Sequence, residues 1–124
     1  MNLISPQTVS ALMTAAFAAA AAIGPVQAST PFDGSWTVQI ITQRGACDPN
    51  SGFGCEIRDG IVSGSGGIPV SGRVARNGSV SVSVASGNRN ANGSGRLSAS
   101  SGGGTWRGIG SQGACSGRWS ASRR

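Results

Sequence analysis

The chain of 124 residues carries ten arginines against four acidic residues, and it has no lysine and no histidine, so its formal net charge is +6. Without histidine, lysine or tyrosine, general acid–base catalysis has few candidate residues. The three cysteines lack the C-x-x-C spacing of zinc sites, and imidazole ligands are absent. We therefore expect a non-enzymatic protein that holds no metal and no cofactor.

The first 28 residues have the layout of a secretory signal peptide. Val9–Ile23 is an unbroken, weakly apolar run, a Gly-Pro pair then ends any helix, and Val26–Ala28 fits a cleavage site. The run is too short to cross a bilayer comfortably as a helix. We expect residues 1–28 to be a cleaved helical signal peptide and residues 29–124 to be a single domain. The product would be secreted or periplasmic, with no transmembrane segment after cleavage.

From Phe32 onward, the chain has the pattern of short strands separated by glycine-rich turns. Val80–Val84 alternates valine with serine, and Asn77-Gly78 before it is typical of a hairpin turn. The candidate strands are Trp36–Ile40, Cys55–Arg58, Ile61–Gly64, Val70–Arg76, Val80–Val84, Ser94–Ser100, Thr105–Gly110 and Cys115–Ala121, with turns at Asp59-Gly60, Gly87–Asn92, Ser101–Gly104 and Ser111–Ala114. This spacing predicts an all-β antiparallel meander of about eight short strands, forming a small barrel or a strongly curved sheet.

A Ser-Gly-Arg tripeptide recurs at Ser71, Ser94 and Ser116, each time followed by an apolar residue. The spacing equals two strands with their turns, so we expect the copies on alternate strands that run in the same direction. Pleating then turns the glycine and the apolar residue inward, and the serine and arginine outward. An inward glycine allows a large neighbour such as tryptophan to approach closely.

Trp36, Trp106 and Trp119 all fall on predicted inward faces. We interpret them first as core residues, because large aromatic side chains dominate the energetics of small cores. The alternative is that they line a pocket inside the barrel. In that case the protein would carry a small apolar ligand.

Arg73, Arg96, Arg107 and Arg118 are expected on the outer face. If the last strands are neighbours, Arg96, Arg107 and Arg118 form a lateral basic stripe. Such a stripe would bind an anionic polysaccharide or lipid head groups. The simpler interpretation is a solvated sheet exterior on which arginines block edge pairing. Specific nucleic-acid binding is not expected, because the aromatic side chains that stack on single strands are predicted to be buried.

Cys47, Cys55 and Cys115 allow three pairings. In a closed meander of eight antiparallel strands, the end of the first strand, near Thr42, lies beside the start of the last strand at Cys115. We therefore favour a Cys47–Cys115 disulfide with Cys55 unpaired. A local Cys47–Cys55 bridge is the alternative, and the odd cysteine can also bridge to another molecule.

The four acidic residues, Asp33, Asp48, Glu56 and Asp59, are most simply explained by turns and loops. Asp33 and Asp59 each precede a glycine, and Asp48 opens a loop of strong turn formers. Asp48 and Glu56 could approach each other, but nothing in the pattern singles them out as a catalytic pair.

Several segments together resemble a family of small secreted proteins from rhizobium-type alphaproteobacteria. They are FDGSWTVQIIT, GAC, VSGRVARNGSVSVSV, GSGRLS, GGTWRG and CSGRWSA, and they span nearly all of residues 29–124. The resemblance implies export and no particular activity; haem use, a label attached to some relatives, is disfavoured by the lack of histidine. Cys55 departs from the family, whose members usually have aromatic residues at the positions of Phe53 and Cys55. The Gly-Thr-Trp and Ser-Gly-Arg rhythm is also similar to avidin-like and lipocalin-like barrels, at the level of fold alone.

Overall fold

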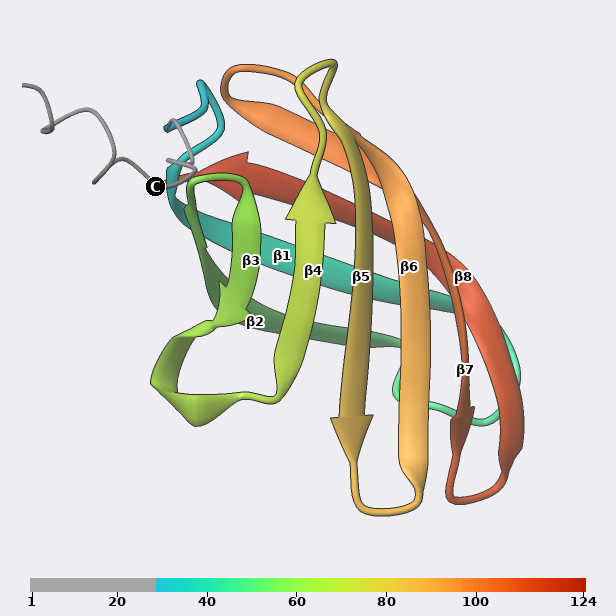
Figure 1. Ribbon diagram of the computed structural model, residues 1–124. Helices are drawn as coiled ribbons and strands as arrows, with labels where there is room; N and C mark the ends of the chain where they lie inside the picture. Colours follow the sequence, from blue (N-terminus) through green and yellow to red (C-terminus); the bar gives the residue numbers. More distant parts are fainter. Residues whose placement is uncertain (1–28) are drawn as a thin grey trace, which may run out of the picture.

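The computed structural model describes residues 29–124, which form a closed antiparallel β-barrel (Figure 1). A short 3-10 turn, η2 (Ser65–Gly67), joins β3 to β4. The predicted signal peptide, residues 1–28, lies outside the described residues. Within the described part of the chain, no helix is long and apolar enough to cross a membrane. The strands are β1 (Gly34–Arg44), β2 (Asn50–Arg58), β3 (Ile61–Gly64), β4 (Val70–Val74), β5 (Ser79–Ser86), β6 (Arg89–Leu97), β7 (Ser101–Gly110) and β8 (Gly113–Arg123).

Each strand pairs with the next one along the chain, and β8 returns to pair with β1. This confirms the predicted meander and decides for a barrel over an open curved sheet. Closure removes the free sheet edges that invite pairing with other chains. The wall is uneven, because β3 and β4 have 4 and 5 residues, whereas β1 and β8 have 11 each (Figure 1).

The predicted turn Ser101–Gly104 is wrong, because the whole of it belongs to β7. The predicted turns Gly87–Asn92 and Ser111–Ala114 extend too far, because β6 begins at Arg89 and β8 begins at Gly113. The predicted strand Ser94–Ser100 also runs too far, since β6 ends at Leu97. These segments consist mostly of Gly, Ser and Asn, which have low intrinsic strand propensity. They are strands because β6 pairs along its length with both β5 and β7.

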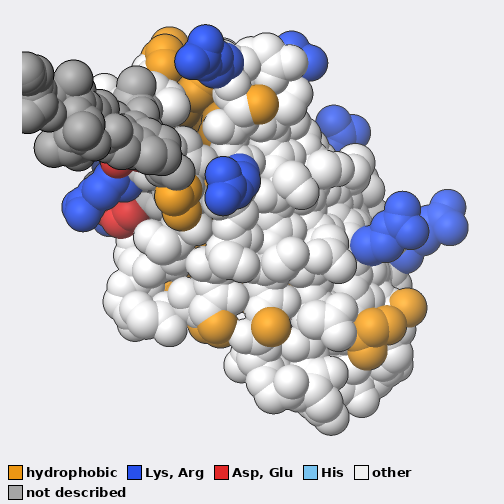
Figure 2. All heavy atoms as spheres, in the orientation of Figure 1, with side chains coloured by type: hydrophobic (Ala, Val, Ile, Leu, Met, Phe, Trp, Pro, Cys, Tyr) orange, Lys and Arg blue, Asp and Glu red, His pale blue; other side chains and the backbone are white. Residues whose placement is uncertain are grey.

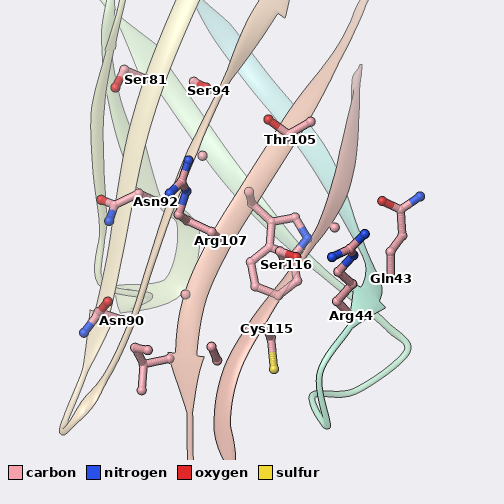
Figure 3. A pocket seen from close by; sticks show the side chains of 16 residues that line it. Gln43, Arg44, Ser81, Asn90, Asn92, Ser94, Thr105, Arg107, Cys115 and Ser116 are labelled. Atoms are coloured by element: carbon pink, nitrogen blue, oxygen red, sulfur yellow. The ribbon is translucent and has the colours of Figure 1, made fainter.

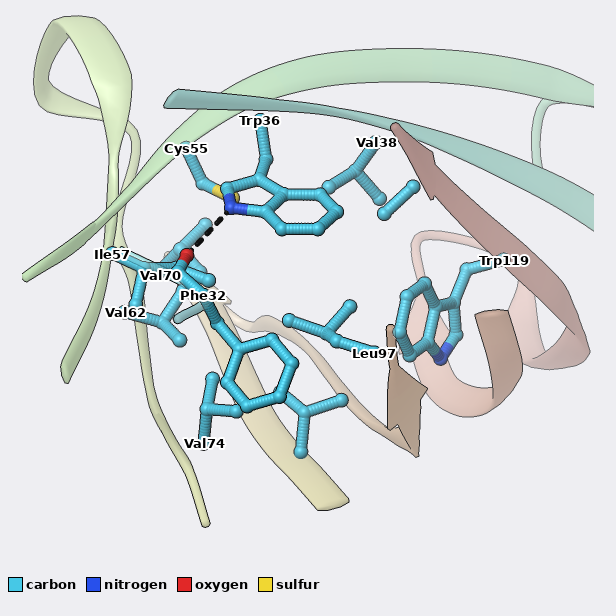
Figure 4. Close-up of a cluster of buried hydrophobic side chains, with 12 residues drawn as sticks. Phe32, Trp36, Val38, Cys55, Ile57, Val62, Val70, Val74, Leu97 and Trp119 are labelled. Carbon is cyan, nitrogen blue, oxygen red and sulfur yellow. Dashed lines mark hydrogen bonds between the residues drawn. The ribbon is translucent and has the colours of Figure 1, made fainter. Parts of the chain in front are cut away.

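The core fills the end of the barrel at which the chain enters β1 and leaves β8. Trp36 is 1 % exposed, and its indole N–H donates to the backbone carbonyl of Phe32 at 2.8 Å (Figure 4). Leu97 and Trp119 belong to the same buried cluster. The predicted core roles of Trp36 and Trp119 are thus confirmed. Trp106 is only partly buried and packs against this cluster.

The Ser-Gly-Arg copies lie on β4, β6 and β8, which run in the same direction in the meander. Their apolar residues, Val74, Leu97 and Trp119, are buried, and the arginine of each copy is exposed. The predicted inward and outward faces are therefore confirmed. The recurrence of the tripeptide reflects the barrel's architecture.

A glycine pair makes room for the Trp119 indole. Gly95 on β6 is opposite Gly104 on β7, and Gly104 is opposite Trp119 on β8. A Cβ atom added to Gly95 would lie 2.8 Å from the Trp119 ring. The indole therefore crosses the inner face of strands that carry no side chain at these positions.

The Arg123 side chain binds the segment that precedes β1 and holds it across the same end of the barrel. Its guanidinium donates to the carbonyl oxygens of Asp33 and Pro31, each at 2.6 Å, and to that of Ala99 at 2.9 Å. It also lies over the Trp36 ring, 4.8 Å from the ring centroid, which is a cation–π geometry. We call this closed part of the barrel the plugged end.

Asp33 ties the plugged end to the turn between β2 and β3. Its carboxylate accepts hydrogen bonds from the Thr30 hydroxyl at 2.7 Å and from the backbone N–H groups of Asp59 at 2.8 Å and Gly60 at 3.2 Å. Desolvation raises the pKa of Asp33, but these hydrogen bonds outweigh it and hold the pKa below its ordinary value. The role of this carboxylate is structural.

Cys47 and Cys115 form a disulfide with 6.2 Å between their Cα atoms, and Cys55 is a buried free cysteine. The favoured pairing is confirmed, and the local Cys47–Cys55 bridge is wrong. The bridge joins the loop after β1 to the start of β8, at the seam where the barrel closes. Burial, with a smaller effect from Glu56, raises the pKa of the Cys55 thiol, so this cysteine stays protonated and unreactive.

Candidate functional site

The four arginines predicted for the outer face, Arg73, Arg96, Arg107 and Arg118, are all exposed. They lie on β4, β6, β7 and β8, respectively. On each of these strands the residues on either side of the arginine are more buried than the arginine itself. The arginines therefore point outward, as predicted.

The predicted lateral stripe of Arg96, Arg107 and Arg118 is wrong. Arg96 is opposite Gly103, Arg107 is opposite Ser116, and Arg118 lies in the lateral row between these two. In an antiparallel hairpin, two residues are opposite each other when they are equally far from the turn. Arginines that recur at a constant interval along the chain therefore fall in different lateral rows. The three side chains occupy neighbouring strands but three different rows.

The outer face of β5–β8 is hollowed around Arg107, and we call this feature the outer hollow. Its volume is about 900 Å³, and it extends to the end of β1. Arg107 on β7 and Arg44 on β1 line it on either side of Ser116 on β8 (Figure 3). Of the four predicted arginines, Arg107 alone lines it. The other polar side chains in the lining carry hydroxyl or amide groups: Gln43, Ser81, Asn90, Asn92, Ser94 and Thr105.

Arg44 is a site residue that the sequence pattern misses. The alternation that turns Trp36 and Val38 inward would also turn Arg44 inward. However, the register of β1 against β8 shifts between Thr42 and Arg44, which is a β-bulge. Because of this shift, Arg44 is opposite Ser116 on the outer face. The one sign of a bend in the sequence is Gly45, which adopts a φ of +95°.

The acidic side chains lie elsewhere in the barrel. Glu56, near the end of β2, accepts a hydrogen bond from the Ser35 hydroxyl at 2.5 Å. Asp48 lies in the loop before the start of β2, so the structure does not bring Asp48 and Glu56 together. Among residues 29–124, no group of three or more His, Cys, Asp or Glu side chains could hold a metal ion.

The positive charge of the outer hollow is not offset by its own lining, which contains no aspartate or glutamate. On the face drawn in Figure 2, the acidic side chains lie together at one edge, and arginines project at several separate places from an otherwise uncharged surface. The guanidinium groups of Arg44 and Arg107 are exposed to solvent. The hollow thus combines permanent positive charge with neutral hydrogen-bonding groups.

The space inside the barrel divides into a small void and a wider mouth. The void has a volume of about 50 Å³ and an entirely apolar lining that includes Trp36 and Trp119. It is much smaller than typical small-molecule sites. The mouth has a volume of about 380 Å³, and Ile40, Val84 and Trp106 contribute to its lining. Of the three tryptophans that the sequence pattern places inside the barrel, only Trp106 therefore lines an interior space large enough for a ligand.

Comparisons of the chain with protein-family models, with curated proteins and with solved structures found no match. The Cys47–Cys115 disulfide fits a protein of the periplasm or the extracellular space, where disulfides persist.

Proposed function

We propose that this protein is an exported, non-enzymatic binding protein that holds an acidic polysaccharide in the outer hollow. The observation that supports the proposal best is the placement of Arg44 and Arg107 on either side of Ser116, in a lining without acidic residues. Export to the periplasm or the extracellular space is supported by the disulfide and by the predicted signal peptide, residues 1–28.

The chemistry of the hollow favours binding over catalysis. A guanidinium group stays charged near neutrality and binds a carboxylate through two parallel hydrogen bonds. The hydroxyl and amide side chains around Arg107 offer donors and acceptors that complement sugar hydroxyl groups. None of these groups exchanges a proton readily at neutral pH, so the lining supports recognition of a charged sugar chain.

The spacing of the two arginines favours a polymer. Arg44 and Arg107 are separated by β8, that is, by two interstrand spacings or about 10 Å between their backbones. A chain with an acidic group at regular intervals can engage both, which raises its effective affinity.

A lipid surface is the other anionic partner expected from the sequence, and the structure favours it less. Surface-bound proteins combine basic residues with apolar side chains that enter the bilayer together. Of the four exposed isoleucines, Ile41, Ile61, Ile68 and Ile109, only Ile109 lines the outer hollow, so the arginines there are not accompanied by a group of exposed apolar side chains. We therefore argue for the polysaccharide and treat anionic vesicles as a test outcome.

The test measures the affinity of residues 29–124 for oligogalacturonate by calorimetry at low and at moderate salt. The double variant Arg44→Gln/Arg107→Gln should weaken binding by about tenfold or more, because it removes two charge-assisted contacts. The matched double variant Arg73→Gln/Arg96→Gln has the same net charge and should retain most of the affinity. A neutral glucan of equal length should not bind.

Equal losses in both double variants would show that binding follows net charge, and the outer hollow would have no special role. Binding to anionic vesicles that is stronger than to oligogalacturonate, and equally sensitive to Arg44→Gln/Arg107→Gln, would assign the hollow to lipid head groups instead. No binding to either probe at low salt would overturn the proposal.

A further inference from the structure

The inner face of β6–β8 contains three successive lateral rows of related composition. Counted from the plugged end to the mouth, the inner rows are Gly95–Gly104–Trp119, Gly93–Trp106–Gly117 and Ala91–Gly108–Cys115. The first two rows each combine two glycines with one tryptophan. The third row has small residues throughout and no aromatic side chain.

In the first inner row, the Trp119 indole occupies the space that Gly95 leaves, and in both of the first two rows the indole is fixed by a hydrogen bond. The Trp119 indole N–H donates to the carbonyl of Ser94 at 3.2 Å, and the Trp106 indole N–H donates to that of Ile41 at 3.1 Å. In the third row, the sulfur of Cys115 is engaged in the disulfide with Cys47. No side chain of that row can therefore fill the barrel as an indole does.

The mouth opens at this third row. Its lining includes Ala91 and Gly108 of the row, the exposed side chain of Ile109, and three further large apolar residues, Ile40, Val84 and Trp106. The last three pack against the buried core, so the floor of the mouth is firm and apolar. Its volume of about 380 Å³ lies within the range of small-molecule sites.

Arg89, the first residue of β6, also lines the mouth. Alternation along β6 turns it to the same side as Ala91, which is the inner face. Asp48, in the loop between β1 and β2, lies on the rim as well. Arg89 and Asp48 are the two charged side chains of the lining, and of these Arg89 belongs to the inner face of the barrel, so the mouth offers an anion a charged partner.

We infer that the mouth is a binding site for a small aromatic anion. Its ring system takes the place in the third inner row that tryptophan takes in the other two, in contact with Val84 and Trp106. Its acidic group meets the Arg89 guanidinium. This inference does not rest on the proposed function, because Arg89 lines the mouth only, whereas Arg44 and Arg107 line the outer hollow only.

The experiment uses two fluorescent probes with the same ring system, 1-anilinonaphthalene-8-sulfonate and the uncharged N-phenyl-1-naphthylamine. Residues 29–124 should bind both and should bind the sulfonate more tightly. Arg89→Gln should weaken sulfonate binding by about tenfold and leave the uncharged probe unchanged, because one charge-assisted contact is lost. Arg96→Gln, on the outer face of the same strand, is the matched control and should change neither affinity. Asp48→Asn should strengthen sulfonate binding slightly.

A second variant tests the place of the ring. Ala91→Phe puts an aromatic side chain into the third inner row and should abolish binding of both probes, with an unchanged or higher melting temperature. If both probes still bind a folded Ala91→Phe protein, or if Arg89→Gln and Arg96→Gln weaken the sulfonate equally, the inference is wrong. Arg44→Gln/Arg107→Gln should leave both probes bound, which separates this site from the outer hollow.

Discussion

Gly95 and Trp119 meet inside the barrel at a distance that leaves no room for a side chain on the glycine. A Cβ atom there would also press against the carbonyl oxygen of Gly103, which is backbone and cannot turn away. The Gly95→Ala substitution should therefore destabilise the protein by about 1–3 kcal/mol, as overpacked cores do. Denaturant unfolding measures this loss, and Ser94→Ala, on the exposed side of β6, should stay within about 0.5 kcal/mol of the parent. Equal stability of Gly95→Ala and the parent would contradict this packing.

A second residue-scale prediction concerns Asp33 and pH. Its folded-state pKa lies below the ordinary value of 3.8, so its stabilising effect is complete above that value and is lost as the pH falls through the folded pKa. Asp33→Asn should lower stability by about 1–2 kcal/mol at neutral pH, because it weakens the bonds that the carboxylate accepts. The deficit should shrink as the pH falls below 3.8 and through the lower folded pKa of Asp33. Melting temperatures measured against pH, with Asp48→Asn as control, test this; a constant deficit at all pH values would contradict it.

At the scale of elements, the sequence pattern predicts the meander where apolar and polar residues alternate, as in Val80–Val84. It fails at the starts of β6 and β7, because there the strands consist mostly of Gly, Ser and Asn and are held by pairing with both neighbours. It also misses Arg44, since one bulge in β1 reverses the face that alternation assigns. The outer hollow was therefore predictable only in part, through Arg107.

The pairing of Cys47 with Cys115 followed from the order of the strands, and it gives a prediction for the seam between β1 and β8. The cysteines are separated by 68 residues, so the chain-entropy model gives about 4 kcal/mol as an upper figure for the stabilisation. The double variant Cys47→Ala/Cys115→Ala should lose most of that in denaturant unfolding. Cys55→Ala should keep the disulfide, and mass spectrometry after alkylation should find no free thiol in it. A free thiol in the Cys55→Ala protein, or no loss of stability in the double variant, would contradict the claim that a Cys47–Cys115 disulfide stabilises the seam between β1 and β8.

At the scale of the whole molecule, the contacts that stabilise the barrel and the two candidate binding sites lie in different parts of it. The plugged end holds the buried tryptophans, the Arg123 contacts and the Asp33 hydrogen bonds, and it leaves a void of only about 50 Å³. The long strands β5–β8, together with β1 and the loop that follows it, carry both candidate sites, with the outer hollow on the outer face and the mouth at the end opposite the plugged end. Because glycine and serine make up much of these strands, few side chains stand between a ligand and the sheet.

The measurement that tests the central claim most directly is a nuclear magnetic resonance titration of residues 29–124 with oligogalacturonate, following backbone amides and arginine Nε–H groups. We predict that the largest shifts fall in one lateral row of the outer hollow, at Arg44, Asn92, Arg107 and Ser116. Shifts of equal size at Arg73 and Arg96, or shifts that fall mainly at the mouth, would contradict the claim that the outer hollow holds the polymer.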